Sequence, residues 1–173
     1  MLETHGGMGR LFDSCYSSFS GVVFEKNPLR AEFLARQRPH WIVYEANCKL
    51  AIEAGFVADL PISVIDVDPF GGPWGVLAAW FLSHRNKQPR LDVVVNDGLR
   101  LRLKLNTAWS TIGLEAEVGR YGGKAVYDKY LEVSREKIEE LAKPCGYTLR
   151  EFTGYYCGHN KDMTHWWAQF TMG

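Results

Sequence analysis

The sequence predicts an α/β fold built on a mostly parallel sheet of seven strands, with helices on both faces and an antiparallel hairpin at the C-terminal end. Three observations indicate this fold. Short apolar runs alternate with stretches of helical period through about the first hundred residues, which is typical of parallel strands joined by crossover helices. Glycine-rich turns follow the first and the fourth of these runs. The last two apolar runs are separated by the polar segment G-H-N-K-D, which is a hairpin signal.

The composition fits one soluble domain spanning residues 1–173, because this length buries a sizeable core and leaves no room for a second domain of ordinary size. The 20 basic and 20 acidic residues cancel, which argues against nucleic-acid binding through one large basic field but is compatible with a local patch. No apolar run approaches the roughly 20 residues of a membrane span, and no signal-peptide pattern opens the chain. The four cysteines form no regular framework, so we expect reduced thiols in a cytoplasmic protein.

Strands are predicted where short runs are apolar, β-branched or alternating. They cover residues 1–4, 22–25, 41–44, 62–67, 91–95, 147–157 and 164–172. Trp166 and Trp167 are neighbours in the last of these strands, and the alternation of side chains lets at most one of them face a substrate.

Helices are predicted where apolar residues recur at helical spacing. They cover residues 9–19, a stretch from Pro28 that Pro39 ends, residues 49–54, a stretch containing Val76, Leu77, Trp80 and Phe81, and residues 126–143. Residues 99–106 are ambiguous, because L-R-L-R-L-K-L alternates with period two while all of its residues are good helix formers. A parallel sheet needs a crossover there, so we expect a helix. The glycine-rich residues 107–125 are expected to form a loop.

The first nine residues, M-L-E-T-H-G-G-M-G, are typical of a strand that turns tightly into a helix. Glycines at such a turn let a ligand approach the backbone, and exposed N–H groups at the helix start favour an anionic group. Glu25 ends the next strand, where a carboxylate can accept hydrogen bonds from ribose hydroxyls. Glu45 and Asp68 also follow strands. Because ligands bind beyond the carboxyl ends of parallel strands, where the strand order reverses, we expect one crevice there.

This layout resembles the class I S-adenosylmethionine (SAM) dependent methyltransferases, whose fold is Rossmann-like, over nearly the whole chain. In that family an acidic residue two positions before the first of three alternate glycines opens the cofactor loop. Glu3, Gly7 and Gly9 match this pattern, and His5 stands where the first glycine is usual. The resemblance implies SAM as cofactor, with its ribose on Glu25. The cofactor-binding residues that it implies are Glu3, His5, Gly6, Gly7, Gly9, Glu25, Lys26, and the pair Glu45 and Ala46 that would flank the adenine.

The most specific stretch is D-P-F-G at Asp68, Pro69, Phe70 and Gly71. It is similar to the D/N/S-P-P-Y/F motif of enzymes that methylate exocyclic amines of nucleobases, and most closely to the D-P-F-G-S motif of the tRNA guanine N2-dimethyltransferases. Such an amine is a poor nucleophile because its lone pair is delocalised into the ring. The resemblance implies that Asp68 and the Pro69 carbonyl accept hydrogen bonds from the N–H groups of this amine, while Phe70 stacks on the base. The expected substrate contacts are Gly71, Trp74 and Arg100.

The resemblance therefore implies methyl transfer from SAM to an exocyclic amino group of a nucleobase, in RNA (tRNA or rRNA) rather than in DNA. Two alternatives stay open: a small-molecule or DNA N-methyltransferase, and a non-catalytic partner subunit of the same fold. Relatives that act on tRNA carry N-terminal elements and an RNA-binding domain that 173 residues do not hold. Substrate selection would then come from residues 107–125, from Arg100, Arg102 and Lys104, or from a partner chain, including a second copy in a homodimer.

No metal site is expected. Cys145, Cys157, His159 and His165 suggest zinc by residue type, but their spacing matches no compact zinc finger. The glycine turn alone also fits a turn without a ligand, and an Asp-Pro pair also starts simple turns.

Overall fold

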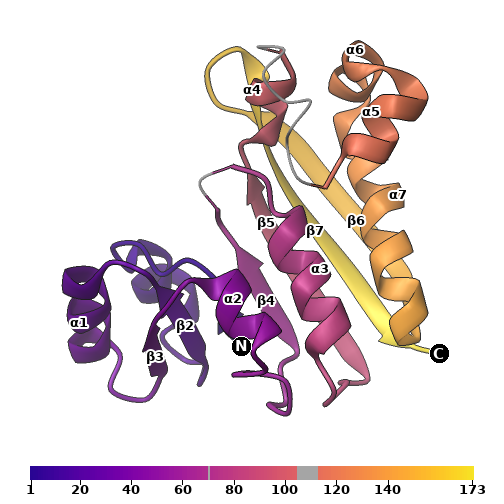
Figure 1. Cartoon of the computed structure of the whole chain (residues 1–173). Helices are drawn as coiled ribbons and strands as arrows, with labels where there is room; N and C mark the ends of the chain where they lie inside the picture. The colour runs from indigo at the N-terminus through magenta and orange to yellow at the C-terminus, as the bar shows by residue number, and fades with distance from the viewer. Residues whose placement is uncertain (70, 105–112) are drawn as a thin grey trace.

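In the computed structural model, which describes residues 1–69, 71–104 and 113–173, the strands form one seven-stranded sheet in the order β3-β2-β1-β4-β5-β7-β6 (Figure 1). The strands are β1 (Leu2–Glu3), β2 (Val22–Glu25), β3 (Ile42–Glu45), β4 (Val64–Val67), β5 (Arg90–Asp97), β6 (Tyr147–Cys157) and β7 (Met163–Met172). Strands β1 to β5 pair in parallel, whereas β7 runs antiparallel to both β5 and β6. The predicted mostly parallel sheet with its antiparallel C-terminal hairpin is confirmed.

Helices connect the parallel strands as crossovers (Figure 1). The described helices are α1 (Pro28–Gln37), α2 (Cys48–Glu53), α3 (Trp74–Ser83), α4 (Leu99–Lys104), α5 (Glu115–Tyr121), α6 (Gly123–Asp128) and α7 (Tyr130–Ala142), with the π-helical turn η1 (Phe12–Tyr16) and the 3-10 turn η3 (Lys143–Cys145). A further 3-10 turn, η4 (His159–Lys161), lies in the hairpin between the antiparallel strands β6 and β7. Asn27 and Asn47 cap α1 and α2, because each side-chain oxygen accepts a hydrogen bond from a backbone N–H in the first turn. None of the described helices has the length and apolar character that a membrane span needs.

The two faces of the sheet have separate cores, because side chains alternate along each strand. The larger core lies under α2, α3 and α7 and includes Phe24 of β2 together with buried residues of β4, β5 and β7. Val23, the preceding residue of β2, points the other way and packs with Phe12, Leu34 and Trp41 beneath α1 and η1. Helices therefore cover both faces of the sheet, as predicted.

The helix predicted over residues 9–19 is wrong in its extent. After Gly9, whose φ is +71°, only two residues are α-helical and the chain continues as η1. Phe12 is buried, whereas Leu11 and Phe19 are 44% and 46% exposed. An apolar stripe that buries so little of its surface does not sustain a regular helix, because helices in proteins depend on packing of their apolar face.

Two further predictions are corrected between residues 107 and 143. The predicted loop over 107–125 contains α5 and the start of α6, and residues 107–112 lie outside the described residues. Glu115 and Glu117 favour a helix start there, since they interact with the positive end of the helix dipole. The single helix predicted over 126–143 is two helices, which are separated at Lys129 (φ −111°, ψ 30°). The helix predicted over 99–106 is confirmed as α4, and residues 105 and 106 lie outside the described residues.

A buried ion pair joins the first strand to the first long helix. Arg38 caps the C-terminus of α1 and is fully buried, and its Nη1 donates to Oε2 of Glu3 at the end of β1. The guanidinium also lies over the rings of Phe12 and Trp41, 4.4 and 5.2 Å from their centroids. Burial raises the pKa of Glu3 although Arg38 lowers it, so removal of Arg38 would leave a strongly disfavoured buried charge.

Replacing Arg38 with alanine should destabilise the protein by about 3–5 kcal/mol, because Glu3 then stays buried without its partner. The double variant Glu3→Gln/Arg38→Met should recover a large part of this loss, since neither buried charge remains. Urea denaturation measures the free energies of unfolding. Arg36→Ala breaks an exposed pair with Glu32 on the same helix and should cost less than about 1 kcal/mol. A loss in Arg38→Ala no larger than in this control contradicts the prediction.

Candidate functional site

The first strand ends in a turn that is held tightly against its neighbours. Gly6 N donates to Phe24 O at 3.0 Å, and a Cβ on Gly6 would lie 2.4 Å from Leu34 Cδ1, so only glycine fits there. Gly9 is packed against α1 in the same way. Gly7 differs, because its φ is +54° and no atom lies within 4 Å of the place where its Cβ would stand. Gly7 therefore presents bare backbone to open space, where a ligand can approach.

Glu25 lies beside this turn at the end of β2 and is 8% exposed. Its Oε2 accepts a hydrogen bond from Gly7 N at 3.0 Å, and its Oε1 accepts one from Asn27 N at 2.8 Å. Each carboxylate oxygen can accept a second bond, so Glu25 holds the turn and keeps acceptor capacity for hydroxyl groups of a ligand. The next strand, β3, ends beside it: Ala46 N donates to Glu25 O at 3.1 Å, and the side chains of Glu45 and Lys26 are exposed.

His5 occupies the turn between β1 and Gly6. Its Nδ1 lies 2.8 Å from Thr4 Oγ1, and its Nε2 lies 3.5 Å from Cys48 Sγ at the start of α2. Burial lowers the pKa of His5, while the charges of Asp68 and Glu25 act in the opposite direction. Burial also raises the pKa of Cys48 to about 11. Near neutral pH the pair therefore consists of an uncharged imidazole and a thiol rather than an imidazolium and a thiolate.

Asp68 and Pro69 follow β4, which is the neighbour of β1 in the sheet. Asp68 is exposed, and its Oδ1 accepts a hydrogen bond from Asn96 Nδ2 at 2.7 Å. Pro69 O accepts one from Gly71 N at 2.9 Å, and Gly71 has a φ of +135° that favours glycine. Phe70 lies outside the described residues. Two oxygen acceptors, a carboxylate and a backbone carbonyl, thus stand at the same edge of the sheet as the glycine turn.

Asp66 lies in β4, two residues before Asp68, and is 3% exposed. Tyr16 of η1 donates its hydroxyl hydrogen to Asp66 Oδ2 at 2.7 Å. Burial raises the pKa of Asp66 to about 6, although the hydrogen bond from Tyr16 lowers it and the charge of Asp68 raises it further. Thr4 donates from both its N and its Oγ1 to the Asp66 carbonyl oxygen, which ties the end of β1 to β4.

Trp74 and Arg100, which were expected to contact a substrate, lie inside the protein. Trp74 is 1% exposed and stacks on Trp166 of β7, with ring centroids 5.8 Å apart. The guanidinium of Arg100 lies 3.9 and 4.2 Å from the ring centroids of Tyr127 and Tyr156, and its N–H groups donate to two backbone carbonyl oxygens. Both side chains are occupied by packing and internal hydrogen bonds, so neither is positioned to contact a substrate.

Two residues at the same edge, Asn96 and Tyr155, escaped the sequence analysis, which named His165 only in connection with zinc. Asn96 of β5, His165 of β7 and Tyr155 of β6 form one row of paired residues across the antiparallel strands. The sequence could have revealed part of this row. Buried and partly exposed side chains alternate along β5 and β7, which puts Asn96 and His165 on the face away from the main core. The pairing register that aligns them across three strands cannot be deduced from a single sequence.

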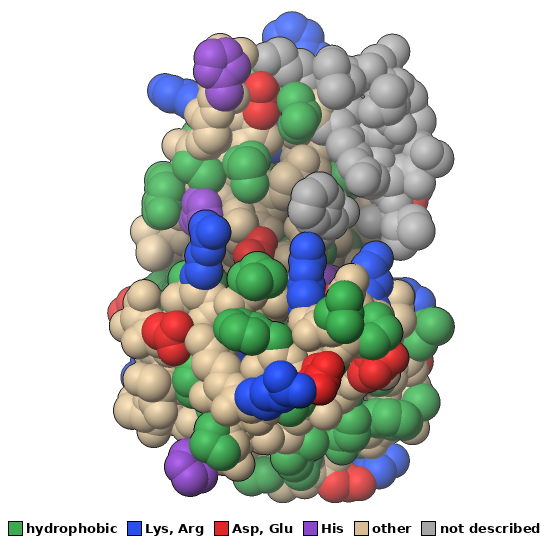
Figure 2. Space-filling view, turned by 90° about the vertical axis from the view of Figure 1, so that its left-hand side faces the viewer, with side chains coloured by type: hydrophobic (Ala, Val, Ile, Leu, Met, Phe, Trp, Pro, Cys, Tyr) green, Lys and Arg blue, Asp and Glu red, His purple; other side chains and the backbone are tan. Residues whose placement is uncertain are grey.

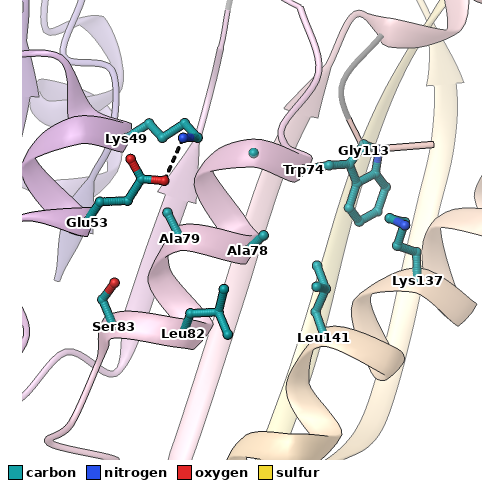
Figure 3. Close-up of a pocket in the computed structure, with 11 residues that line it drawn as sticks. Lys49, Glu53, Trp74, Ala78, Ala79, Leu82, Ser83, Gly113, Lys137 and Leu141 are labelled. Carbon is teal, nitrogen blue, oxygen red and sulfur yellow. Dashed lines mark hydrogen bonds and ion pairs between the residues drawn. The ribbon is translucent and has the colours of Figure 1, made fainter. Parts of the chain in front are cut away.

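A separate groove of about 460 Å³ runs along α3 between α2 and α7 (Figure 3). Apolar side chains line it, including Ala78, Leu82 and Leu141, and the ion pair of Lys49 and Glu53 lies at one rim. Of the predicted site residues that the structure describes, only Trp74 lines this groove. It is therefore distinct from the carboxyl edge of the sheet.

The described residues hold no metal cluster, and the face of the molecule where α1 lies carries charges of both signs. Within residues 1–69, 71–104 and 113–173, no three His, Cys, Asp or Glu side chains gather in a way that could hold a metal ion. On the side of the molecule where α1 lies, Figure 2 shows positive and negative side chains interspersed with hydrophobic ones. This agrees with the zero net charge of the chain.

No protein-family model matches the sequence, and no curated protein matches it. Solved structures match the fold. The chain is similar to Trm1 from Pyrococcus horikoshii, solved with S-adenosyl-L-methionine, with a TM-score of 0.70 and 12% identity over 99% of this chain and 50% of that one. It is similar to M. jannaschii TYW2, solved with AdoMet, with a TM-score of 0.58 and 12% identity over 99% of this chain and 68% of that one.

A third similar structure is the N-methyltransferase NodS from Bradyrhizobium japonicum WM9, with a TM-score of 0.55 and 11% identity over 99% of this chain and 84% of that one. These likenesses establish the predicted Rossmann-like fold, which the chain shares with these structures. The chain spans about half the length of the Trm1 chain that it matches.

Replacing Asp66 with asparagine should raise stability at pH 7 and flatten its pH dependence. Because folding raises the pKa of Asp66 to about 6, its protonated form contributes stability that is complete below about pH 4 and lost as the pH rises through 6. Asparagine keeps an oxygen for the Tyr16 hydroxyl and carries no charge, so the gain at pH 7 should reach roughly 1–3 kcal/mol. Urea denaturation between pH 4 and 7 measures it.

Asp92→Asn is the contrasting variant, because the pKa of Asp92 is shifted in the opposite direction to that of Asp66. The pKa of Asp92 is lowered, because hydrogen bonds from Arg90, Gln169 and Trp167 outweigh the effect of burial. The wild-type advantage over Asp92→Asn should therefore be present near neutral pH and fall as the medium becomes acidic. Parallel pH profiles for wild type and Asp66→Asn would refute the assignment of a raised pKa to Asp66.

Proposed function

We propose that this chain is a SAM-dependent methyltransferase that modifies an exocyclic amino group of a nucleobase, in RNA rather than in DNA. The observation that carries the proposal is the position of the Asp68–Pro69 corner on β4, beside β1 and at the same edge as the glycine turn and Glu25. A turn open to a ligand and a pair of oxygen acceptors thus share the point where the strand order reverses. Ligands of open α/β sheets bind at such points.

The residues of the glycine turn fit SAM. Gly7 leaves room for a ligand against its backbone, and Glu25 keeps acceptor capacity suited to ribose hydroxyls. Burial lowers the pKa of His5, so its imidazole is uncharged near neutral pH and does not repel the positive charge of a sulfonium. When bound, SAM supplies an electrophilic methyl group. Glu45 and Ala46, at the end of β3, are the residues that we assign to the adenine side of the site.

The corner supplies what an amine acceptor needs. In this proposal Asp68 and the Pro69 carbonyl each accept a hydrogen bond from one of the two N–H groups of an exocyclic amine, which draws its nitrogen towards tetrahedral geometry and frees its lone pair. Methylation leaves a positive charge and one excess proton on that nitrogen. The Asp68 carboxylate stabilises this charge and is positioned to receive the proton or to pass it to water. The motif resemblance assigns the stacking contact with the base to Phe70.

A small-molecule amine is a second candidate acceptor. It is favoured by the zero net charge, since RNA-binding surfaces usually carry excess positive charge, and by the likeness to an N-methyltransferase such as NodS. Incubation of the protein with labelled SAM and a cell extract separates the two candidates. Label in the RNA fraction supports the first, and label only in low-molecular-weight metabolites supports the second.

The cofactor assignment predicts that Glu25→Ala abolishes SAM binding, because it removes both the ribose acceptor and the anchor of Gly7. Glu25→Gln keeps one oxygen acceptor and should weaken binding by roughly 10- to 100-fold. Isothermal titration calorimetry with SAM and its demethylated product measures both. Glu53→Ala, at an exposed carboxylate on α2, is the matched control and should bind as wild type does. Absence of binding by the wild-type chain would favour the non-catalytic partner subunit instead.

The acceptor assignment predicts that Asp68→Ala lowers methyl incorporation into bulk RNA by roughly 100-fold or more while SAM binding persists. The reason is that Asp68 contacts the reacting amine and not the cofactor. Asp59→Ala removes another exposed carboxylate, which is paired with Arg85, and should leave incorporation unchanged. Full activity of Asp68→Ala on RNA would remove the corner from the mechanism.

A further inference from the structure

The face of the sheet opposite α3 and α7 is partly exposed between β5 and β6. Along β5 and β7, residues that face the helices are buried, whereas the alternate residues are partly exposed. Away from the candidate site this second face is tied together by hydrogen bonds from Trp167 and Gln169 to Asp92. The row nearest the candidate site has a different chemistry.

That row consists of Asp68, Asn96, His165 and Tyr155, which belong to or directly follow β4, β5, β7 and β6. Asn96 Nδ2 donates to Asp68 Oδ1 at 2.7 Å, and His165 is the direct cross-strand partner of both Asn96 and Tyr155. Directly opposed residues of antiparallel strands project their side chains to the same face. Next to the oxygen acceptors of the Asp68–Pro69 corner, the same row of the sheet therefore presents the amide of Asn96 and then the rings of His165 and Tyr155.

The two rings form a flat, accessible surface. His165 and Tyr155 stack with centroids 5.4 Å apart and an interplanar angle of 18°. Tyr155 is 61% exposed, which is more than any other Phe, Tyr or Trp among the described residues. An exposed ring face of this kind suits stacking by a nucleobase. Lys161, in the turn η4 that joins β6 to β7, is also exposed and brings positive charge for a phosphate.

We infer that this row is the acceptor-binding surface of the site, in which Asn96 positions Asp68 and the His165–Tyr155 stack holds a further base of a single-stranded RNA. The inference rests on the proposed function and narrows it. At about 4.8 Å between strands, Tyr155 lies three strands and about 14 Å from Asp68. One base does not bridge this distance, so the row fits an acceptor of several nucleotides and not a free nucleoside or a small amine.

Asn96 acts through Asp68 and is a positioning residue. Its amide N–H engages one oxygen of the carboxylate, which restrains the plane of the group and leaves the other oxygen for the amine. Removing this hydrogen bond should therefore affect the methyl-transfer step, whereas removing the Tyr155 ring should affect how tightly a long acceptor is held.

RNA binding tests the stack directly. Fluorescence anisotropy would use a dye-labelled single-stranded RNA of mixed sequence and about twelve nucleotides, at low salt, with and without S-adenosylhomocysteine. Tyr155→Ala should weaken binding by about 5- to 150-fold, as expected for the loss of one stacked base, and Tyr155→Phe should bind within about twofold of wild type. Phe33→Ala, at an exposed ring on α1, is the matched control and should leave binding unchanged.

Steady-state kinetics separate the two roles. On the same RNA, Tyr155→Ala should raise KM and leave kcat near the wild-type value, whereas Asn96→Ala should lower kcat by about 10-fold or more with little change in KM. Thermal unfolding verifies that each variant is folded. Free nucleosides should be methylated far less efficiently than the RNA by the wild-type chain.

Equal RNA affinities of wild type, Tyr155→Ala and His165→Ala would overturn the inference, as would free nucleosides that react as efficiently as the RNA. Failure of the chain to bind SAM in calorimetry would overturn the proposed function instead. The RNA-binding measurement needs no cofactor, so the two failures are distinguishable.

Discussion

The buried pair of Glu3 and Arg38 is the constraint on which the candidate site depends. It joins the end of β1 to the end of α1, and the glycine turn runs between these two points. With Arg38 held between Phe12 and Trp41, α1 packs so closely that only glycine fits at position 6. The pair itself contributes little net stability, but loss of either partner would leave the other charge buried and unpaired at the base of the turn.

The chemistry of the site follows from where the backbone ends its strands. The turn after β1 offers open backbone at Gly7, the residue ending β2 is a carboxylate, and the residues following β4 are an aspartate and a proline. Hydrogen bonds between segments hold two of these groups, because Gly7 N donates to Glu25 and Asn96 donates to Asp68. A site assembled in this way combines groups that are far apart in sequence and keeps them at fixed spacing, which favours proximity and orientation effects over specialised side chains.

Most of the strands could be predicted from the sequence, and so could the meeting of the glycine turn, Glu25 and Asp68 at one edge of the sheet, because apolar runs and glycines report local geometry. The burial of a side chain by residues that are distant in the sequence could not be predicted. Trp74 was expected to face a substrate, but the stacking partner that buries it, Trp166, lies at the other end of the chain. Arg100 is likewise enclosed by Tyr127 and Tyr156. The row through Asn96 and His165 depends on the register in which β5 and β7 pair. The periodicity of a single strand does not reveal that register.

The unequal division of the two cores has a consequence for how the molecule opens. Among the described residues, the buried cluster beneath α1 and η1 consists of Phe12, Val23, Leu34 and Trp41, whereas the other core runs through most of the sheet. Local unfolding costs least where few apolar contacts are lost, so backbone amides of α1 and η1 should exchange with solvent before those of β4, β5 and β7. A ligand bound at the glycine turn would slow this exchange through mass action alone, and hydrogen exchange would then report occupancy of the site without any assay of turnover.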